Sequence, residues 1–500
     1  MTDTPLANMF RSDWVHEWGV LLLAGLLALP LFTPRVYGAD EIKYFATLRS
    51  LLVDRDLHYE NEYAHFIERD PVAHAGLVPF RDGATATGYR LNDAPIGTAL
   101  LWAPFYIAAD GVVAAARVFG STVPRDGYSR PYVWAVCLAS LFWGLTGLAL
   151  IYRMCRAYTD RTSATWAVLA VWFASPVMFY LYITPAMAHA NSLFAVALFL
   201  TLWQRARSER TMGRWSALGA AAGLMVLVRE LNWLGLAVVV VDELITLGLA
   251  TVQSNRSSRT ERCAFGSLVY GVLAKRLAGY LVFALALGVV VAPQFYVYKT
   301  LNGTYGPTPF IVDKFSPLPV YGLDVLFSGF HGLFSWHPIT MVGALGLLAM
   351  LWRTSDGESR PPRLAMRELF DRPDARVAMA FVAFFVAQVL VVGSYETWWG
   401  GASFGARRFI NCTALFALGA ATWHARARQL PRAASVAMLA MFVVWNVGLT
   451  IQYSTGLIPR DAPVKMSRIV YNQFVEVPPR VTDIAWRFFF NRGSFYRTRF

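Results

Sequence analysis

The sequence predicts an all-α, polytopic transmembrane protein with about 11 membrane-spanning helices. Hydrophobic residues make up 56% of its 500 residues, charged residues only 15%, and the mean hydropathy is +0.42. This composition is typical of proteins embedded in a bilayer. Apolar stretches recur along the chain, and a helix of about 20 residues crosses the hydrocarbon core. The four cysteines are scattered without a CxxC pair, which argues against a zinc site or a disulfide framework.

Eleven apolar runs give the predicted spans. The first is read as an uncleaved helix rather than a secretory signal, because acidic residues offset Arg11 in front of it. The runs lie at 18–33, 131–152, 163–182, 187–204, 215–229, 231–249, 277–298, 337–352, 377–394, 408–424 and 433–453.

The distribution of arginine predicts the topology. The connections after the second, fourth, sixth, eighth and tenth runs are strongly basic, so the positive-inside rule places them and the N-terminus in the cytoplasm. An odd number of spans then leaves the C-terminus outside. This parity requires that the apolar segment 96–118, which contains Pro104 and Asp110, lies along or dips into the outer face without crossing.

The chain is predicted to consist of a transmembrane domain and a short tail, and one long loop of the domain lies outside the membrane. We expect a transmembrane domain over 1–455 that includes a first extracytoplasmic loop at 34–130, too long for a simple connector. Helices on the membrane surface are expected within this loop. A short extracytoplasmic tail follows at 456–500, and its alternation of basic and aromatic residues suits anionic headgroups.

The most informative feature is the acidic pair Asp40–Glu41, a few residues after the first span. Carboxylates at a membrane boundary persist mainly where they face a protein interior or an aqueous cavity. An ordinary interfacial charge pair is the alternative interpretation.

Further polar and aromatic residues fall on the same predicted face. Simpler roles are open for several of them: a hydrogen-bonded helix end for the histidine, an aromatic belt for the tryptophans, and snorkelling for paired arginines. Arg229 is harder to explain this way, since it lies between two apolar runs and needs an anionic partner such as Glu230 or a phosphate. The candidates are Tyr44, Arg90, Asp93, His189, Asn191, Arg229, Glu230, Trp398, Trp399, Arg407 and Arg408.

Carboxylates with arginines suit an enzyme that deprotonates a hydroxyl while it holds a phosphate leaving group. A divalent cation stays open as a cofactor, because Asp40, Glu41, Asp93 and His189 are suitable ligand types, although no tight ligand spacing supports a site.

The chain resembles the GT-C superfamily of integral-membrane glycosyltransferases. Within it, the chain is similar to the protein O-mannosyltransferase, aminoarabinose transferase and arabinofuranosyltransferase groups, which use polyprenyl-phosphate sugars. The resemblance rests on the acidic pair in Gly38-Ala-Asp-Glu-Ile-Lys-Tyr44, on the segment Asn92–Pro104 and on Gly223–Arg229. Relatives often carry a lysine in the second motif, which this chain lacks.

The resemblance implies a transferase at the external face of a bacterial inner membrane. A sugar would pass from a polyprenyl-phosphate carrier to a hydroxyl of an envelope glycan, lipid or protein, with no nucleic-acid partner. It implies that Asp40, paired with Glu41, is the catalytic base and that arginines replace the missing lysine as phosphate ligands: Arg90, Arg229, Arg407 and Arg408. Sugar contacts would come from Tyr44, Asp93, His189, Asn191, Glu230, Trp398 and Trp399.

Two other classes of protein are weighed against the transferase. A transporter or flippase of a lipid-linked sugar would use Asp40, Arg229 and Glu230 to line a path. However, the chain shows no repeated halves, and transport does not explain the long first loop. A non-catalytic scaffold for envelope assembly would not need the acidic pair.

Overall fold

The computed structural model describes residues 14–256, 259–308, 313–352, 370–427 and 429–497. Residues 1–13 and residues 353–369 of the basic connection after the eighth run, both predicted to be cytoplasmic, lie outside these ranges. The described chain is built from helices, with two isolated bridges, Ala84–Arg90 and Phe315–Tyr395. It divides into two compact units, each assembled from separate stretches of sequence.

The first unit comprises 1–32, 151–179 and 314–500. Its core is a close pair of helices, α16 (Pro338–Leu351) and α19 (Thr413–Arg426), flanked by α7 and α18. A Cβ on Gly346 would stand 1.9 Å from the carbonyl oxygen of Gly419, so only glycine permits this approach, as in other membrane helix pairs. Its other elements are α1 (Trp14–Ala28), η2 (Leu29–Leu31), α7 (Arg161–Phe173), α8 (Pro176–Met178), α14 (Gly322–Phe327), α15 (Leu333–Trp336), α18 (Pro373–Gly393), η7 (Arg407–Cys412), α20 (Arg432–Ser454), α21 (Met466–Tyr471), η8 (Asn472–Glu476), η9 (Pro478–Arg480), α22 (Val481–Phe490) and α23 (Ser494–Arg497).

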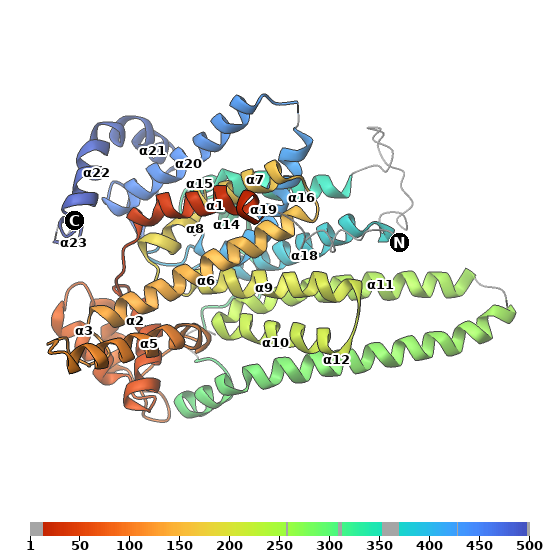
Figure 1. Ribbon diagram of the computed structural model, residues 1–500, viewed down its shortest axis with the longest axis horizontal. Helices are drawn as coiled ribbons and strands as arrows, with labels where there is room; N and C mark the ends of the chain where they lie inside the picture. The colour runs from red at the N-terminus through yellow and green to blue at the C-terminus, as the bar shows by residue number, and fades with distance from the viewer. Residues whose placement is uncertain (1–13, 257–258, 309–312, 353–369, 428, 498–500) are drawn as a thin grey trace. The chain divides into compact units, whose positions relative to one another are not determined.

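The second unit comprises 33–150 and 180–313. Its helix α10 (Met212–Val228) packs against both α9 (His189–Ser208) and α12 (Arg259–Asn302), which run alongside it in Figure 1. The α10–α12 contact is close because Gly219 faces the carbonyl of Phe283, where a Cβ would lie 2.2 Å from the oxygen. Its other elements are α2 (Ala39–Arg49), η3 (Ser50–Asp54), α3 (Glu60–Arg69), η4 (Ala75–Leu77), α4 (Val78–Asp82), α5 (Gly97–Val118), α6 (Arg130–Arg156, which enters the first unit at Ile151), η5 (Phe179–Ile183), η6 (Glu230–Leu236) and α11 (Ala237–Arg256).

The predicted all-α, polytopic fold is confirmed. Six helices in the described ranges are long and apolar enough to cross a membrane, or seven if the bent pair 161–173 and 176–183 is one span. Three shorter apolar helices, Trp18–Leu31, Met212–Val228 and Pro338–Leu351, match further predicted runs, but the count of 11 is not confirmed. Helix α5 meets the criteria of a spanning helix, so its placement on the outer face stays a prediction.

Candidate functional site

Helix α2 positions the acidic pair in its first turn, where the helix dipole favours negative charge. Glu41 is buried, and its carboxylate accepts hydrogen bonds from the backbone N–H groups of Tyr37 (2.6 Å) and Gly38 (2.9 Å). Burial raises the pKa of Glu41, although Arg35 and the two N–H groups oppose this shift. Glu41 therefore caps the helix that carries its neighbour.

Asp40 is the accessible member of the pair, with 38% of its side chain exposed. Its carboxylate lies 3.1 Å from the ammonium group of Lys43, one turn further along α2. Lys43 is buried, stands 4.4 Å from the centre of the Phe80 ring and also hydrogen-bonds to Asp93. Burial alone would lower the pKa of Lys43, but the carboxylates of Asp93 and Asp40 outweigh it and raise the pKa. An ion-pair chain thus joins Asp40, Lys43 and Asp93.

The irregular segment after Arg90 brings Asp93 to α2. The Asn92 amide donates to the carbonyl of Lys43 (3.2 Å) and to Thr47 Oγ1 (3.1 Å). The hydroxyl of Tyr63 holds the same segment by donating to the Leu91 carbonyl (3.0 Å). Two parts of the first loop that are 50 residues apart in sequence therefore share one charged site.

Arg229 stands at the break between α10 and η6, where the backbone is extended with φ −153° and ψ 128°. Its guanidinium Nη1 lies 3.2 Å from Nδ1 of the buried His189, the first residue of α9. A guanidinium only donates, so Nδ1 accepts and a neutral imidazole carries its proton on Nε2. The ring of Tyr180 packs on His189 with centroids 4.4 Å apart.

The pKa of Tyr44 is affected by the charges of both groups. Burial raises its pKa to about 12, and the charges acting on the phenol include Arg229, Asp40, Lys43 and Asp93. These residues are therefore within electrostatic range of one hydroxyl. We call Asp40, Lys43, Tyr44, Asp93, His189 and Arg229 the charged cluster of the second unit.

Three other predicted residues of the second unit have different surroundings. Glu230 accepts a hydrogen bond from the hydroxyl of Tyr298 on α12. Asn191 is fully buried, and neither amide atom finds a hydrogen-bond partner among the described residues. Arg90 pairs with the exposed Glu60 at 2.9 Å. The contacts of Arg90 thus lead to the start of α3 and not to Asp40.

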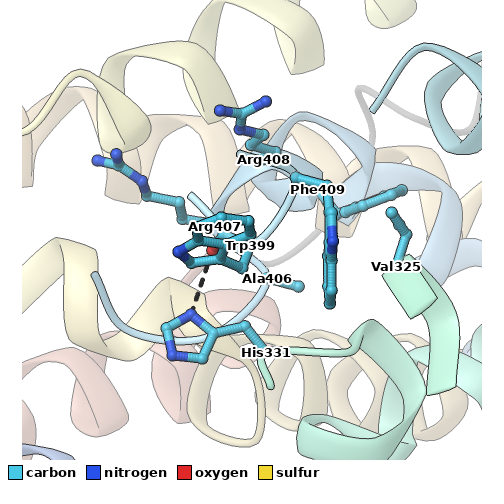
Figure 2. A pocket seen from close by; sticks show the side chains of 8 residues that line it. Val325, His331, Trp399, Ala406, Arg407, Arg408 and Phe409 are labelled. Carbon is cyan, nitrogen blue, oxygen red and sulfur yellow. Dashed lines mark hydrogen bonds between the residues drawn. The ribbon is translucent and has the colours of Figure 1, made fainter. Parts of the chain in front are cut away.

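The remaining predicted residues line a pocket in the first unit. Figure 2 shows the side chains of Arg407 and Arg408 extending to the same side, above His331 and beside Trp399. The pocket contains about 210 Å³ of empty space, including its open mouth. Its lining residues are Val325, His331, Trp398, Trp399, Ala406, Arg407, Arg408 and Phe409.

A glycine-rich loop shapes this pocket. Arg407 Nη2 donates to the Gly400 carbonyl (2.7 Å), and Gly400 has a φ of +87° that an L side chain rarely adopts. The guanidinium of Arg408 lies 4.4 Å from the centre of the Tyr395 ring. The indole N–H of Trp399 donates a hydrogen bond to Asp461 (2.8 Å), which does not itself line the pocket.

His331 forms the floor of the pocket and was left out of the predicted site. It is buried, has a φ of +61°, and its Nδ1–H donates to the Trp399 carbonyl (3.2 Å). Burial lowers the pKa of His331 to about 4, and the charge of Arg407 lowers it further. The hydrogen bond to the Trp399 carbonyl raises the pKa but only partly offsets these two effects. Its Nε2 is buried without a hydrogen-bond partner in the described chain.

Lys43 was also missed, although it lies three residues after Asp40 on the same helix face. This spacing is the signal that finds it in the sequence. For a metal, the ranges described above contain no group of three His, Cys, Asp or Glu side chains placed to hold an ion.

Comparisons with known proteins give one likeness. No family model matches the chain, and no curated protein matches it. The chain is similar to the crystal structure of ArnT from Cupriavidus metallidurans bound to undecaprenyl phosphate, at 14% identity and a TM-score of 0.47, covering 96% of this chain and 78% of that one. At this identity and TM-score the likeness carries no argument about the function of this chain.

Proposed function

We propose that this protein is a glycosyltransferase that moves a sugar from a polyprenyl-phosphate carrier to an acceptor hydroxyl. The observation that carries the proposal is the charged cluster of the second unit, in which the accessible Asp40 ends an ion-pair chain and Arg229 lies within electrostatic range. A carboxylate that accepts a proton and a guanidinium that binds phosphate are the two groups this reaction requires.

In the proposed reaction, Asp40 takes the proton of the acceptor hydroxyl as its oxygen attacks the anomeric carbon. The bond between that carbon and the phosphate oxygen breaks, and the bond to the acceptor oxygen forms. The electron pair leaves on the polyprenyl phosphate, where Arg229 stabilises the developing charge. Lys43 orients Asp40, and Glu41 holds the first turn of α2.

We assign the pocket of the first unit to binding, independently of the proton transfer. Two guanidinium groups and two indoles suit an anionic or sugar-ring portion of a substrate. Tyr44, Asn191 and Glu230 are proposed sugar contacts in the second unit. A divalent cation remains a prediction that a Mg²⁺ titration of metal-depleted protein would test.

The proposed location is a bacterial inner membrane, with the cluster on the external face, the N-terminus inside and the C-terminus outside. A cysteine placed near Ser454 should react with an impermeant reagent from outside, and one near position 360 only from the cytoplasm. External labelling near position 360 would overturn the orientation and the face assigned to the site.

Release of free polyprenyl phosphate from sugar-loaded donors tests the activity, with an envelope fraction as the acceptor source. Asp40→Asn should reduce the rate by about 10²–10⁴-fold, the usual contribution of a general base. Glu60→Gln is the matched control, since Glu60 is an exposed carboxylate that contacts Arg90.

Three outcomes separate the candidate classes of protein. A transporter would move the donor and leave the sugar–phosphate bond intact. A scaffold would show no turnover with any donor. Wild-type release by Asp40→Asn would remove Asp40 from the chemistry even if the protein is a transferase.

A further inference from the structure

The C-terminal tail presents a row of exposed aromatic side chains. Phe474 on η8 is 71% exposed, and on α22 Trp486 is 63% and Phe490 71% exposed. Phe489 is also exposed, and residues 486, 489 and 490 follow the i, i+3, i+4 spacing that places them on one side of a helix. We call Trp486, Phe489 and Phe490 the aromatic face of the tail, and Phe474 is a further exposed aromatic residue on η8.

The opposite side of α22 is less exposed. Ile484 and Phe488 are partly buried, and Phe488 lies under the guanidinium of Arg492 at 4.2 Å. Helix α22 therefore carries its most exposed aromatic side chains, Trp486, Phe489 and Phe490, together on one side. Exposed apolar patches of this kind mark protein-binding or membrane-binding surfaces.

Two attachments fix the tail to the ends of apolar helices. On one side, Gln452 in the last turn of α20 donates to the Ile469 carbonyl (3.2 Å) and to Gln473 (3.0 Å). On the other side, Arg492 donates to the carbonyls of Phe32 and Pro30, both at 2.8 Å. Helix α20 is a candidate span and 18–31 an apolar helix, so the tail lies at the ends of both. In Figure 1 the dark blue helices α21 to α23 lie beyond the end of α20.

Charge favours lipid over a neutral protein partner. Residues 455–500 contain eight basic side chains and three acidic ones. Arg487 lies over the Phe495 ring at 4.7 Å, and Arg468 over Tyr471 at 5.5 Å, so basic groups alternate with aromatic ones along the tail. Aromatic rings with flanking arginines are the composition of helices that lie in the headgroup region of anionic membranes.

We propose that α21–α22 is an interfacial anchor whose aromatic face inserts into the headgroup region of the membrane that α20 crosses. Its ligand is the surface of a bilayer that contains anionic phospholipid. This inference concerns a surface that the proposed transfer reaction does not use, so either proposal can fail alone.

Depth-dependent quenching in proteoliposomes of the full-length protein tests the anchor. Phe490→Cys is labelled with an environment-sensitive fluorophore in a Cys263→Ser background. Cys137, Cys155 and Cys412 are buried, and their residual labelling is measured in that background alone. Arg480→Cys is the control position, because Arg480 is exposed and its pairing with Glu476 is a surface contact.

The label at 490 should be quenched by lipids carrying a spin label near the headgroup and protected from aqueous iodide, whereas iodide should reach the label at 480. The emission of the label at 490 should shift further to the blue when phosphatidylglycerol is added to phosphatidylcholine. The double substitution Lys465→Gln and Arg468→Gln should reduce this additional blue shift. Iodide quenching at 490 equal to that at 480 would overturn the proposal.

Two further results would also overturn it. Protection from both quenchers, with disulfide cross-linking of Phe490→Cys between molecules in detergent, would assign the face to a second copy. Lipid quenching that is absent at position 490 and also at Phe474→Cys, in variants that remain monodisperse, would assign it to a protein partner.

Discussion

In the charged cluster of the second unit the basic side chains contact carboxylates and an imidazole, whereas the two arginines that line the pocket of the first unit contact a backbone oxygen and an aromatic ring. Lys43 contacts Asp40 and Asp93, and Arg229 contacts His189. Arg407 instead donates to the Gly400 carbonyl, and Arg408 covers the Tyr395 ring.

This difference separates two chemical capacities. Groups that titrate lie next to one another in the charged cluster, as proton transfer requires. The pocket of the first unit instead combines fixed cations, indoles and a neutral buried histidine around an open space, as binding of an anion or a sugar ring requires. Substitutions in each region test this difference.

The largest expected effect is at Lys43. Lys43→Met leaves Asp93 and Asp40 without their shared cation and should lower the free energy of unfolding by about 3–5 kcal/mol, the usual result of breaking a buried ion pair. The measurement is thermal or denaturant unfolding in detergent. Adding Asp93→Asn to Lys43→Met should recover part of the loss, since the double variant removes the stranded charge. If the loss of unfolding free energy in the double variant equals the sum of the losses in the two single variants, Lys43 and Asp93 do not act as a pair.

The next largest effect is expected at Arg229, where substitution should reduce turnover. If it stabilises the leaving phosphate, Arg229→Gln should lower kcat by about 10²–10³-fold, as removal of one transition-state donor does elsewhere. Arg229→Lys should restore part of this, because a point charge lacks the planar fork. Arg407→Gln should instead raise KM with kcat retained, the result expected for uniform binding.

Arg90→Gln provides the control, because its contact is the exposed Glu60. Equal losses of kcat in Arg229→Gln and Arg407→Gln would remove the contrast between the two regions. A loss of folding in Arg229→Gln that matches its loss of activity would assign this arginine a structural role through His189.

The fold was largely predictable from the sequence, and the site only in part. Apolar runs of helical length report burial in lipid directly, so the helical class follows from composition. The acidic pair was found because its position at the end of a span is local information. The role of Glu41 as a cap depends on the N–H groups of Tyr37 and Gly38, which the sequence shows only as neighbours.

Long-range pairing accounts for what was missed. Lys43 joins Asp93 across 50 residues, and His331 meets the Trp399 carbonyl across 68. Arg90 pairs with Glu60 across 30 residues. No local pattern distinguishes these outcomes, because a lysine or arginine finds whichever carboxylate the backbone brings near.

His331 gives the pocket a predicted pH response. Its pKa of about 4 lies below the ordinary histidine value of 6.5, so the stability it contributes is complete above pH 6.5 and is lost as pH falls toward 4. The shift corresponds to about 3 kcal/mol. His331→Asn tolerates the left-handed backbone and should therefore reduce the loss of stability between pH 7 and pH 4 by about that amount. An unchanged pH dependence of the unfolding temperature would contradict the burial of a neutral imidazole.

The smallest expected effect separates the two members of the acidic pair. Glu41→Ala removes the acceptor of two backbone N–H groups and should cost about 0.5–2 kcal/mol, the range for lost helix caps. Glu41→Gln keeps one oxygen acceptor and should cost less. Asp40→Asn should show the reverse profile, with a near-normal unfolding temperature and a large loss of turnover. Because Glu41 and Asp40 are adjacent, unfolding temperature and polyprenyl-phosphate release measured on the same samples assign the cap and the base separately. If Glu41→Gln lost turnover as completely as Asp40→Asn while keeping its stability, the buried carboxyl would belong to the chemistry and not to the helix.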